Sequence, residues 1–185
     1  REVFNAVDAE GQSRFNLYDT FGSMDSEDLY NKIRFMVKGL DCKIIWLDHL
    51  SILVSGLGQI ADERRAFDSI MHELKSLSVE LDCYIGLISH LNNNTQTPFE
   101  NGGTITINNL RGSGGIKQLS DAVIALSRNQ QAENDIERNT TKISVLKNRF
   151  TGETGISDMV FYNGFTGKFE QEKDFIDDDA VGGFQ

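Results

Sequence analysis

Apolar residues recur at helical spacing in two stretches of the chain. The first stretch predicts a helix that Gly39 ends in a left-handed conformation, and its apolar positions are Leu29, Ile33, Met36 and Val37. The second stretch predicts a longer helix over residues 62–81, with the acidic side chains of Asp62 and Glu63 at its positively polarised end. Each pattern is typical of a helix with one face against a core.

Continuous apolar runs predict strands that are covered on both faces. Two of them are residues 43–47 and 83–89, and residues 15–19 form a shorter candidate. A short helix is expected near residues 115–120, and three more strands follow at 122–127, 142–147 and 159–162 without helices between them. This order predicts an α/β fold with a mainly parallel twisted sheet flanked by helices, and hairpin-like strands at one edge.

Composition and charge limit the size of the domain and the kind of nucleic-acid site that it can carry. A chain of 185 residues with 39% hydrophobic residues is long enough for one domain with a sizeable core. The net charge of −10 argues against nucleic-acid binding through overall basicity, so any DNA site must be local. The two cysteines, Cys42 and Cys83, border apolar runs and are expected to be reduced thiols in the core of a cytoplasmic protein.

The two ends of the chain carry expectations of their own. No apolar run is long enough to span a membrane. Because the chain starts at Arg1 in what resembles the middle of a domain, we expect it to be a fragment of a longer polypeptide. Residues 1–168 are expected to form the folded part, and the acidic residues 169–185 a disordered tail.

Polar side chains follow two of the predicted parallel strands. Asp48 comes directly after an apolar strand, which is the position of a carboxylate beside the Mg²⁺ of a bound nucleotide, although such an Asp is more often a loop residue. His90 follows the next strand and would face the same crevice, unless it is a hydrogen-bonded structural histidine. Lys147 and Arg149 end a later strand on the same side, where they suit phosphate neutralisation or form an exposed basic pair.

Six motifs occur in a fixed order along the chain. They are Leu-Asp-His-Leu-Ser at 47–51, Ser-His-Leu at 89–91, Leu-Arg-Gly-Ser-Gly at 110–114, Gln-Leu-Ser-Asp at 118–121, Arg-Asn-Gln-Gln at 128–131 and Lys-Asn-Arg-Phe-Thr-Gly at 147–152. The whole series resembles the helicase domain of DnaB-type hexameric replicative helicases, most closely the primase-helicases of short-tailed phages and the related mitochondrial helicase Twinkle. The resemblance covers about residues 15–168.

The resemblance implies a RecA-like NTPase core and a role for each motif. Asp48 would be the carboxylate that organises Mg²⁺ and its waters, and His90 the sensor of the γ-phosphate. Arg149 would be the arginine finger that reaches the nucleotide site of the neighbouring subunit, with Lys147 beside it and Arg128 near the phosphates. The DNA contacts would come from the motif at 110–114 and the loop after His90, through Arg111, Gly112, Ser113, Asn92 and Asn93.

The chain departs from the family pattern in two places. The loop after His90 contains asparagines where lysines are expected, and no Gly-x-x-x-x-Gly-Lys-Ser/Thr phosphate loop occurs. We expect that loop to lie upstream of Arg1 in the full protein, and the isolated chain to be inactive because it lacks the amide cradle and lysine for the nucleotide phosphates.

Three functions remain open from the sequence. The first is an NTP-driven helicase motor, using ATP or dTTP with Mg²⁺, that acts as a hexameric ring on single-stranded DNA in the cytoplasm of a phage-infected bacterium. The second is a RecA- or RadA-type recombinase, which forms filaments instead of closed rings. The third is a non-catalytic binding or assembly module. The acidic tail is expected either to aid solubility or to dock on a basic patch of a DNA polymerase.

Overall fold

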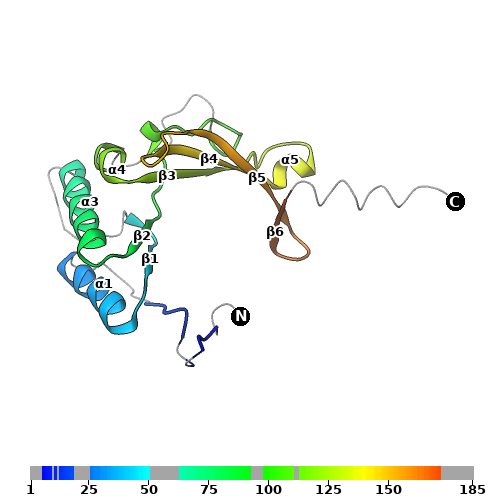
Figure 1. The fold of residues 1–185 in the computed structure, drawn as a ribbon. Coiled ribbons are helices and arrows are strands. Elements are labelled where there is room, and N and C mark those ends of the chain that lie inside the picture. The colour runs from blue at the N-terminus through cyan, green and yellow to red at the C-terminus, as the bar shows by residue number, and fades with distance from the viewer. Residues whose placement is uncertain are drawn as a thin grey trace.

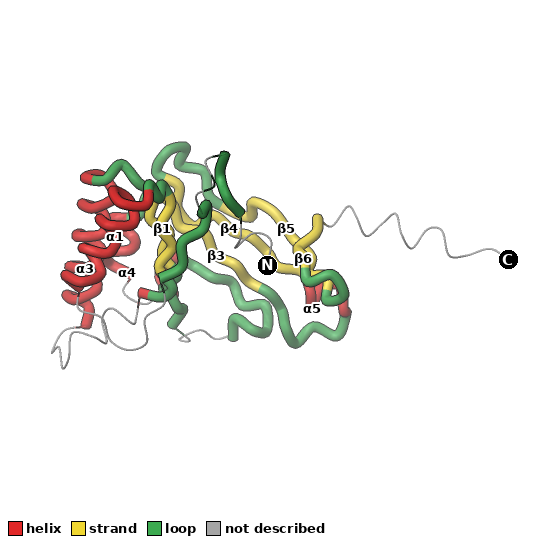
Figure 2. The backbone as a smooth tube through the Cα atoms, turned by 90° about the horizontal axis from the view of Figure 1, so that it is seen from below, coloured by secondary structure: helices red, strands yellow, loops and turns green. Residues whose placement is uncertain are grey.

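A computed structural model describes residues 6–9, 11, 13–18, 26–50, 63–92, 98–110 and 113–171. Two helices lie side by side against a short parallel sheet, and an antiparallel sheet extends away from them (Figure 1). Helices α1, α3 and α4 lie together at one end of the molecule, on one side of the strands (Figure 2). The predicted α/β class is confirmed.

The parallel sheet is built from two helix–strand units. Helix α1 (Ser26–Leu40) leads into strand β1 (Ile44–Leu47), and helix α3 (Glu63–Glu80) leads into strand β2 (Tyr84–Leu87). The two strands pair in parallel, with Ile44 opposite Tyr84 and Leu47 opposite Leu87. Both predicted helices and both predicted strands are confirmed, and the carboxyl ends of the strands lie at the same edge.

The same tripeptide, Leu-Asp-Cys, occurs at the end of both helices, at residues 40–42 and 81–83. Asp41 and Asp82 adopt left-handed backbone conformations, with φ of 53° and 49°. A left-handed residue lets a helix turn sharply into the next strand, and Asp is one of the few non-glycine residues enriched there. Gly39, which was predicted to take this position, lies inside α1 instead, so that prediction was wrong.

The second sheet has four strands in the order β3-β4-β5-β6, all antiparallel. Two short helices precede this sheet, η2 (Ile107–Asn109) and α4 (Ser113–Leu119). The sheet itself contains β3 (Ala122–Ser127), β4 (Thr140–Asn148), β5 (Gly155–Asn163) and β6 (Lys168–Gln171), with α5 (Asp135–Asn139) between β3 and β4. Parallel pairing among the described strands is thus confined to β1 and β2. The sequence predicted no helix between the last strands, but the short helix α5, which the Asn134 side chain caps, lies between β3 and β4.

The core lies between α1, α3 and the sheet. It is formed by Leu29, Ile33, Val37, Ile45, Leu50, Ala66, Phe67, Ile70, Met71, Leu74, Leu77, Leu81, Leu110, Ile116 and Val123. On the opposite face of β1 and β2, the side chains of Ile44, Trp46 and Tyr84 are 59%, 68% and 61% exposed. Among the described residues, β1 and β2 are therefore covered on one face only. The prediction from their apolar sequences, that both faces are covered, was wrong for these residues.

Three smaller expectations also differ from the structure. Residues 15–18 form no strand. Cys42 and Cys83 are free thiols, as predicted, but they are half-buried at the edge of the core. Strand β6 continues past the predicted boundary at residue 168 to Gln171, and the remainder of the predicted tail lies outside the described residues.

Within the part of the chain that the structure describes, no helix combines the length and the apolar character that crossing a bilayer requires.

Candidate functional site

The carboxyl ends of β1 and β2 bring Asp48 and His90 to one edge of the parallel sheet. Ile88 donates its backbone N–H to the carbonyl of Leu47 at 3.0 Å, and Leu50 donates to the carbonyl of Ile88 at 3.0 Å, so the two strand ends stay paired past the sheet itself. Both Asp48 and His90 are exposed. In parallel sheets this edge is where ligands bind.

His49 connects the two strand ends through its ring. Its imidazole packs edge-on against that of His90, with 4.2 Å between ring centroids and 70° between ring planes. The Nδ1 atom of His49 is buried and has no hydrogen-bond partner among the described residues. The contact fixes the approach of the segment after β1 to the segment after β2, and His49 had no predicted role.

The segment that follows His90 is joined to the segment that precedes Arg111. Leu91 forms an isolated antiparallel bridge with Leu110, and Asn92 donates its N–H to the carbonyl of Asn109 at 2.7 Å. Residues 98–110 are held by these contacts and by a hydrogen bond from the Gln130 backbone N–H to the carbonyl of Glu100. A displacement at His90 would therefore be passed directly to the start of the predicted DNA-binding motif.

The predicted DNA-contact residues are only partly described. Asn92 is exposed, and Ser113 is the first residue of α4. Arg111, Gly112 and Asn93 lie outside the described residues.

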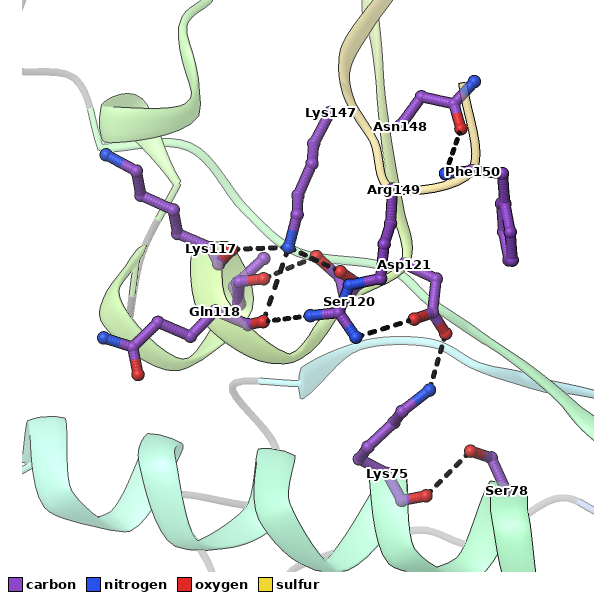
Figure 3. Close-up of polar contacts among 11 residues, drawn as sticks. Lys75, Ser78, Lys117, Gln118, Ser120, Asp121, Lys147, Asn148, Arg149 and Phe150 are labelled. Carbon is purple, nitrogen blue, oxygen red and sulfur yellow. Dashed lines mark hydrogen bonds and ion pairs between the residues drawn. The ribbon is translucent and has the colours of Figure 1, made fainter. Parts of the chain in front are cut away.

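A cluster of charged groups lies where the end of β4 meets the start of β3 (Figure 3). The pairing of Ala122 with Asn148 places Asp121 opposite Arg149, whose backbone N–H donates to the carbonyl of Asp121 at 2.8 Å. The Arg149 guanidinium donates from Nη1 to Asp121 Oδ1 at 3.2 Å and from Nη2 to the carbonyl of Gln118 at 2.8 Å. The Arg149 side chain remains 49% exposed.

Lys147 is directed toward the end of α4. Its ammonium donates to the carbonyls of Lys117 and Ser120, both at 2.7 Å, and more weakly to that of Gln118 at 3.4 Å. The last carbonyls of a helix have no partner within the helix, and a cation there is favourable. Desolvation lowers the pKa of Lys147, and the positive charge of Arg149 lowers it further, while Asp121 opposes both.

Asp121 is shared by two cations. Lys75, from the middle of α3, donates to Asp121 Oδ2 at 2.7 Å, while Arg149 holds the other carboxylate oxygen. The hydrogen bond from Lys75 lowers the pKa of Asp121 most, and the charges of Lys75, Arg149 and Lys147 add to it against partial desolvation. One carboxylate thus faces three cations, which leaves the cluster with an excess of positive charge.

Arg128 does not join this cluster. It directly follows β3, whereas Asp121 directly precedes that strand. A strand of this length separates its two ends by roughly 20 Å. The structure therefore separates Arg128 from Lys147 and Arg149, which the sequence had grouped as phosphate-binding cations.

Arg149 and Lys147 also stay apart from the edge that carries Asp48 and His90. Across the described ranges, their side chains hydrogen-bond to Asp121 and to the carbonyls at the end of α4, and to neither of those two residues. The chain thus presents a carboxylate–histidine edge on β1 and β2 and a separate cationic cluster on β4. No group of three or more potential metal ligands occurs in the portion that the structure describes.

No sequence pattern indicated Lys75 as a partner of this cluster. Lys75 lies 46 positions before Asp121, on a helix whose pattern indicates only its apolar face. Asp121 belongs to a recognised motif, but the sequence assigned it no contact. The antiparallel register of β3 and β4 would have been the only guide to its place opposite Arg149.

Comparison with known proteins shows which family the chain belongs to. The sequence profile of the DnaB-like helicase C terminal domain matches residues 2–171. The DNA helicase/primase of Enterobacteria phage T3 is 40% identical over 161 residues, which cover 86% of this chain and 28% of that protein. The chain therefore spans less than a third of that relative. With a profile match over nearly all of its length, the chain belongs to the DnaB-like helicase C-terminal domain family.

Proposed function

We propose that this chain is part of a replicative DNA helicase motor, in which NTP hydrolysis at subunit interfaces drives movement along single-stranded DNA and duplex unwinding. The observation that carries the proposal is the separation of the Asp48–His90 edge from the cationic cluster around Arg149. In a ring of identical subunits, a heterologous interface brings two different surfaces of the same chain together. One subunit would then supply Asp48 and His90, and its neighbour Arg149.

The residues at the sheet edge fit a Mg²⁺–NTP complex. Mg²⁺ usually keeps several waters and takes one or two carboxylates together with the phosphates of its nucleotide. Asp48 is exposed there, and the unpartnered Nδ1 of His49 lies close by. Asp48 would hold the ion, directly or through water, and the ion would supply charge neutralisation to the phosphates of ATP or dTTP.

The cationic cluster fits the opposite side of the same nucleotide. Arg149 would stabilise negative charge on the transferring phosphoryl group. Lys147 would add positive charge while its ammonium remains on α4. Arg128 is too far from both to act at the same phosphate from the same subunit, and we infer that any contact it makes lies elsewhere on the nucleotide.

The state of the nucleotide would be coupled to DNA binding through the bridge that joins the segment after His90 to the motif at 110–114. The Leu91–Leu110 bridge and the Asn92–Asn109 hydrogen bond support a path of this kind. His90 would respond to the γ-phosphate, and Arg111, Gly112, Ser113, Asn92 and Asn93 would contact the DNA strand in the central channel of the ring.

The proposal is tested with the full-length protein that carries this domain. It predicts Mg²⁺-dependent NTP hydrolysis that single-stranded DNA stimulates, unwinding of a forked duplex, and loss of both activities in Asp48→Asn. A recombinase would instead form filaments on single-stranded DNA and exchange strands without unwinding the fork. For the 185-residue chain alone we expect no turnover, because its sequence contains no Gly-x-x-x-x-Gly-Lys-Ser/Thr loop to hold the phosphates, and robust hydrolysis by it would contradict that expectation.

We also propose that the acidic residues beyond β6 dock on a basic patch of a DNA polymerase in the bacterial cytoplasm. Carboxylates there are interspersed with Phe175 and Ile176, which suits a contact that opposite charge steers and salt weakens. Truncation after Gln171 leaves β6 intact and should lower polymerase binding at low ionic strength without changing DNA-stimulated NTP hydrolysis. Unchanged binding would favour a tail that only aids solubility.

A further inference from the structure

Arg149 uses only part of its hydrogen-bonding capacity within the chain. A guanidinium carries five N–H donors in a rigid fork. Nη1 donates to Asp121 and Nη2 to the carbonyl of Gln118. These are the guanidinium's only hydrogen bonds among the described residues, and the side chain remains 49% exposed. The guanidinium is therefore anchored along one side and available to an anion on the other.

The two partners of the guanidinium, Asp121 and the end of α4, are themselves held by further hydrogen bonds. Asp121 is fixed by Lys75 on α3 at 2.7 Å, and its backbone carbonyl accepts the N–H of Arg149 at 2.8 Å. The end of α4, which supplies the Gln118 carbonyl, is tied to β4 by Lys147. These contacts limit the positions that the Arg149 side chain can adopt, and Figure 3 shows the carboxylate of Asp121 between the Lys75 ammonium and the Arg149 guanidinium.

We propose that Asp121 is a positioning residue for Arg149: it orients the guanidinium so that the remaining donors project toward a nucleotide on the neighbouring subunit. The inference rests on the proposed function, because it requires Arg149 to act at that nucleotide. Orientation of a charged group before reaction lowers the barrier without any contact between the orienting residue and the substrate. Asp121 itself touches no phosphate in this arrangement.

The test is a comparison of steady-state NTP hydrolysis by the full-length protein and its variants. Asp121→Asn keeps the shape of the side chain but removes the charge that holds Arg149. We expect kcat to fall roughly tenfold to a hundredfold, as for a misplaced catalytic group, with little change in KM for the nucleotide. Arg149→Ala should lower kcat by on the order of a thousandfold.

A double-mutant cycle separates positioning from a general structural role. If Asp121 acts through Arg149, Asp121→Asn should cause no further loss in the Arg149→Ala background, whereas independent structural effects would add. Lys75→Met removes the other partner of the carboxylate and leaves the Arg149 contact in place, so it measures how much Lys75 adds to the positioning. Its loss of kcat should be smaller than that of Asp121→Asn and should likewise disappear in the Arg149→Ala background.

Each outcome decides one point. Wild-type kcat in Asp121→Asn, with Arg149→Ala strongly impaired, overturns the positioning role and leaves the proposed function intact. Wild-type kcat in Arg149→Ala overturns both. Should Asp121→Asn fail to assemble into rings, Asp121→Glu keeps the charge but displaces it by one methylene. It should assemble and still lose turnover, and full activity of that variant would contradict the inference.

Discussion

Alanine at position 115 should force α3 and α4 apart. Gly115 lies in the second half of the first turn of α4, packed on α3, and an added Cβ would lie 2.6 Å from Asp68 Oδ1 and 3.2 Å from the backbone Cα of Asp68. The carboxylate oxygen is buried and has no partner among the described residues. The Cα cannot move without its helix, so the two helices must separate.

The size of the effect follows from two opposing contributions. Overpacking of this kind costs about 1–3 kcal/mol, whereas replacing a helical glycine by alanine gains up to about 1 kcal/mol in helix propensity. We expect a net loss of about 1 kcal/mol, which corresponds to a fall in Tm of roughly 2–4 °C for a domain of this size.

Thermal unfolding followed by circular dichroism measures this loss, and Gly39→Ala is the control. Gly39 is also helical, but its added Cβ would meet the side chain of Phe35 at 3.0 Å, and that ring is 62% exposed and free to rotate. Gly39→Ala should therefore leave stability unchanged or raise it by up to about 1 kcal/mol. Equal or greater stability of Gly115→Ala relative to wild type would refute the close approach of α3 and α4.

Two further predictions concern Asp121 and Trp46. The folded-state pKa of Asp121 is depressed, so its pairing with Lys75 stabilises the fold at neutral pH. This stabilisation decreases once the pH falls below about 4, the ordinary pKa of Asp, and is lost as the pH falls through the lower folded-state pKa. The difference in urea stability between wild type and Lys75→Met should accordingly be present at pH 7 and shrink at pH 3, and a difference independent of pH would contradict the pairing. Gly86→Ala should displace the indole of Trp46, since the new Cβ would lie 2.4 Å from its Cε3 atom. As Trp46 is the only tryptophan, its emission should shift to longer wavelength, whereas Gly164→Ala, with no atom within 4 Å of its added Cβ, should leave emission unchanged.

The sequence predicted those features that depend on local pattern. The helices α1 and α3 follow from apolar spacing, and the shared edge of Asp48 and His90 follows from two apolar runs that each end in a polar residue. The left-handed residue at the end of α1 is Asp41 and not Gly39, and propensity could not predict this. Asp and Gly both tolerate the left-handed conformation, and the continuation of α1 through two more residues, to Leu40, decides between them.

The parts that the sequence missed depend on contacts between distant segments. Lys75, Asp121 and Arg149 meet only because β3 and β4 pair in one register and α3 packs beside them, and Asp121 is 46 and 28 positions from its two partners. Register also separates Arg128 from Arg149, although both were assigned to phosphates from their motifs. Motifs identified the kinds of residue at the site, and pairing of the strands decided which of them lie together.

In the proposed ring, each nucleotide site combines the Asp48–His90 edge of one subunit with Arg149 of the next. Mixing of variant subunits of the full-length protein tests this shared site. Asp48→Asn and Arg149→Ala should each be inactive alone, since one lacks the carboxylate at every interface and the other lacks the guanidinium. When equal amounts are mixed into common rings, about one quarter of the interfaces, half times half, would pair an intact Asp48 with an intact Arg149.

The measurement is NTP hydrolysis without DNA, with native mass spectrometry to establish that the two variants share rings. We expect mixing to restore turnover to as much as about a quarter of the wild-type rate. If mixed rings form and hydrolysis stays at the level of the separate variants at every mixing ratio, the two halves of the site belong to the same subunit and the proposed shared site is wrong.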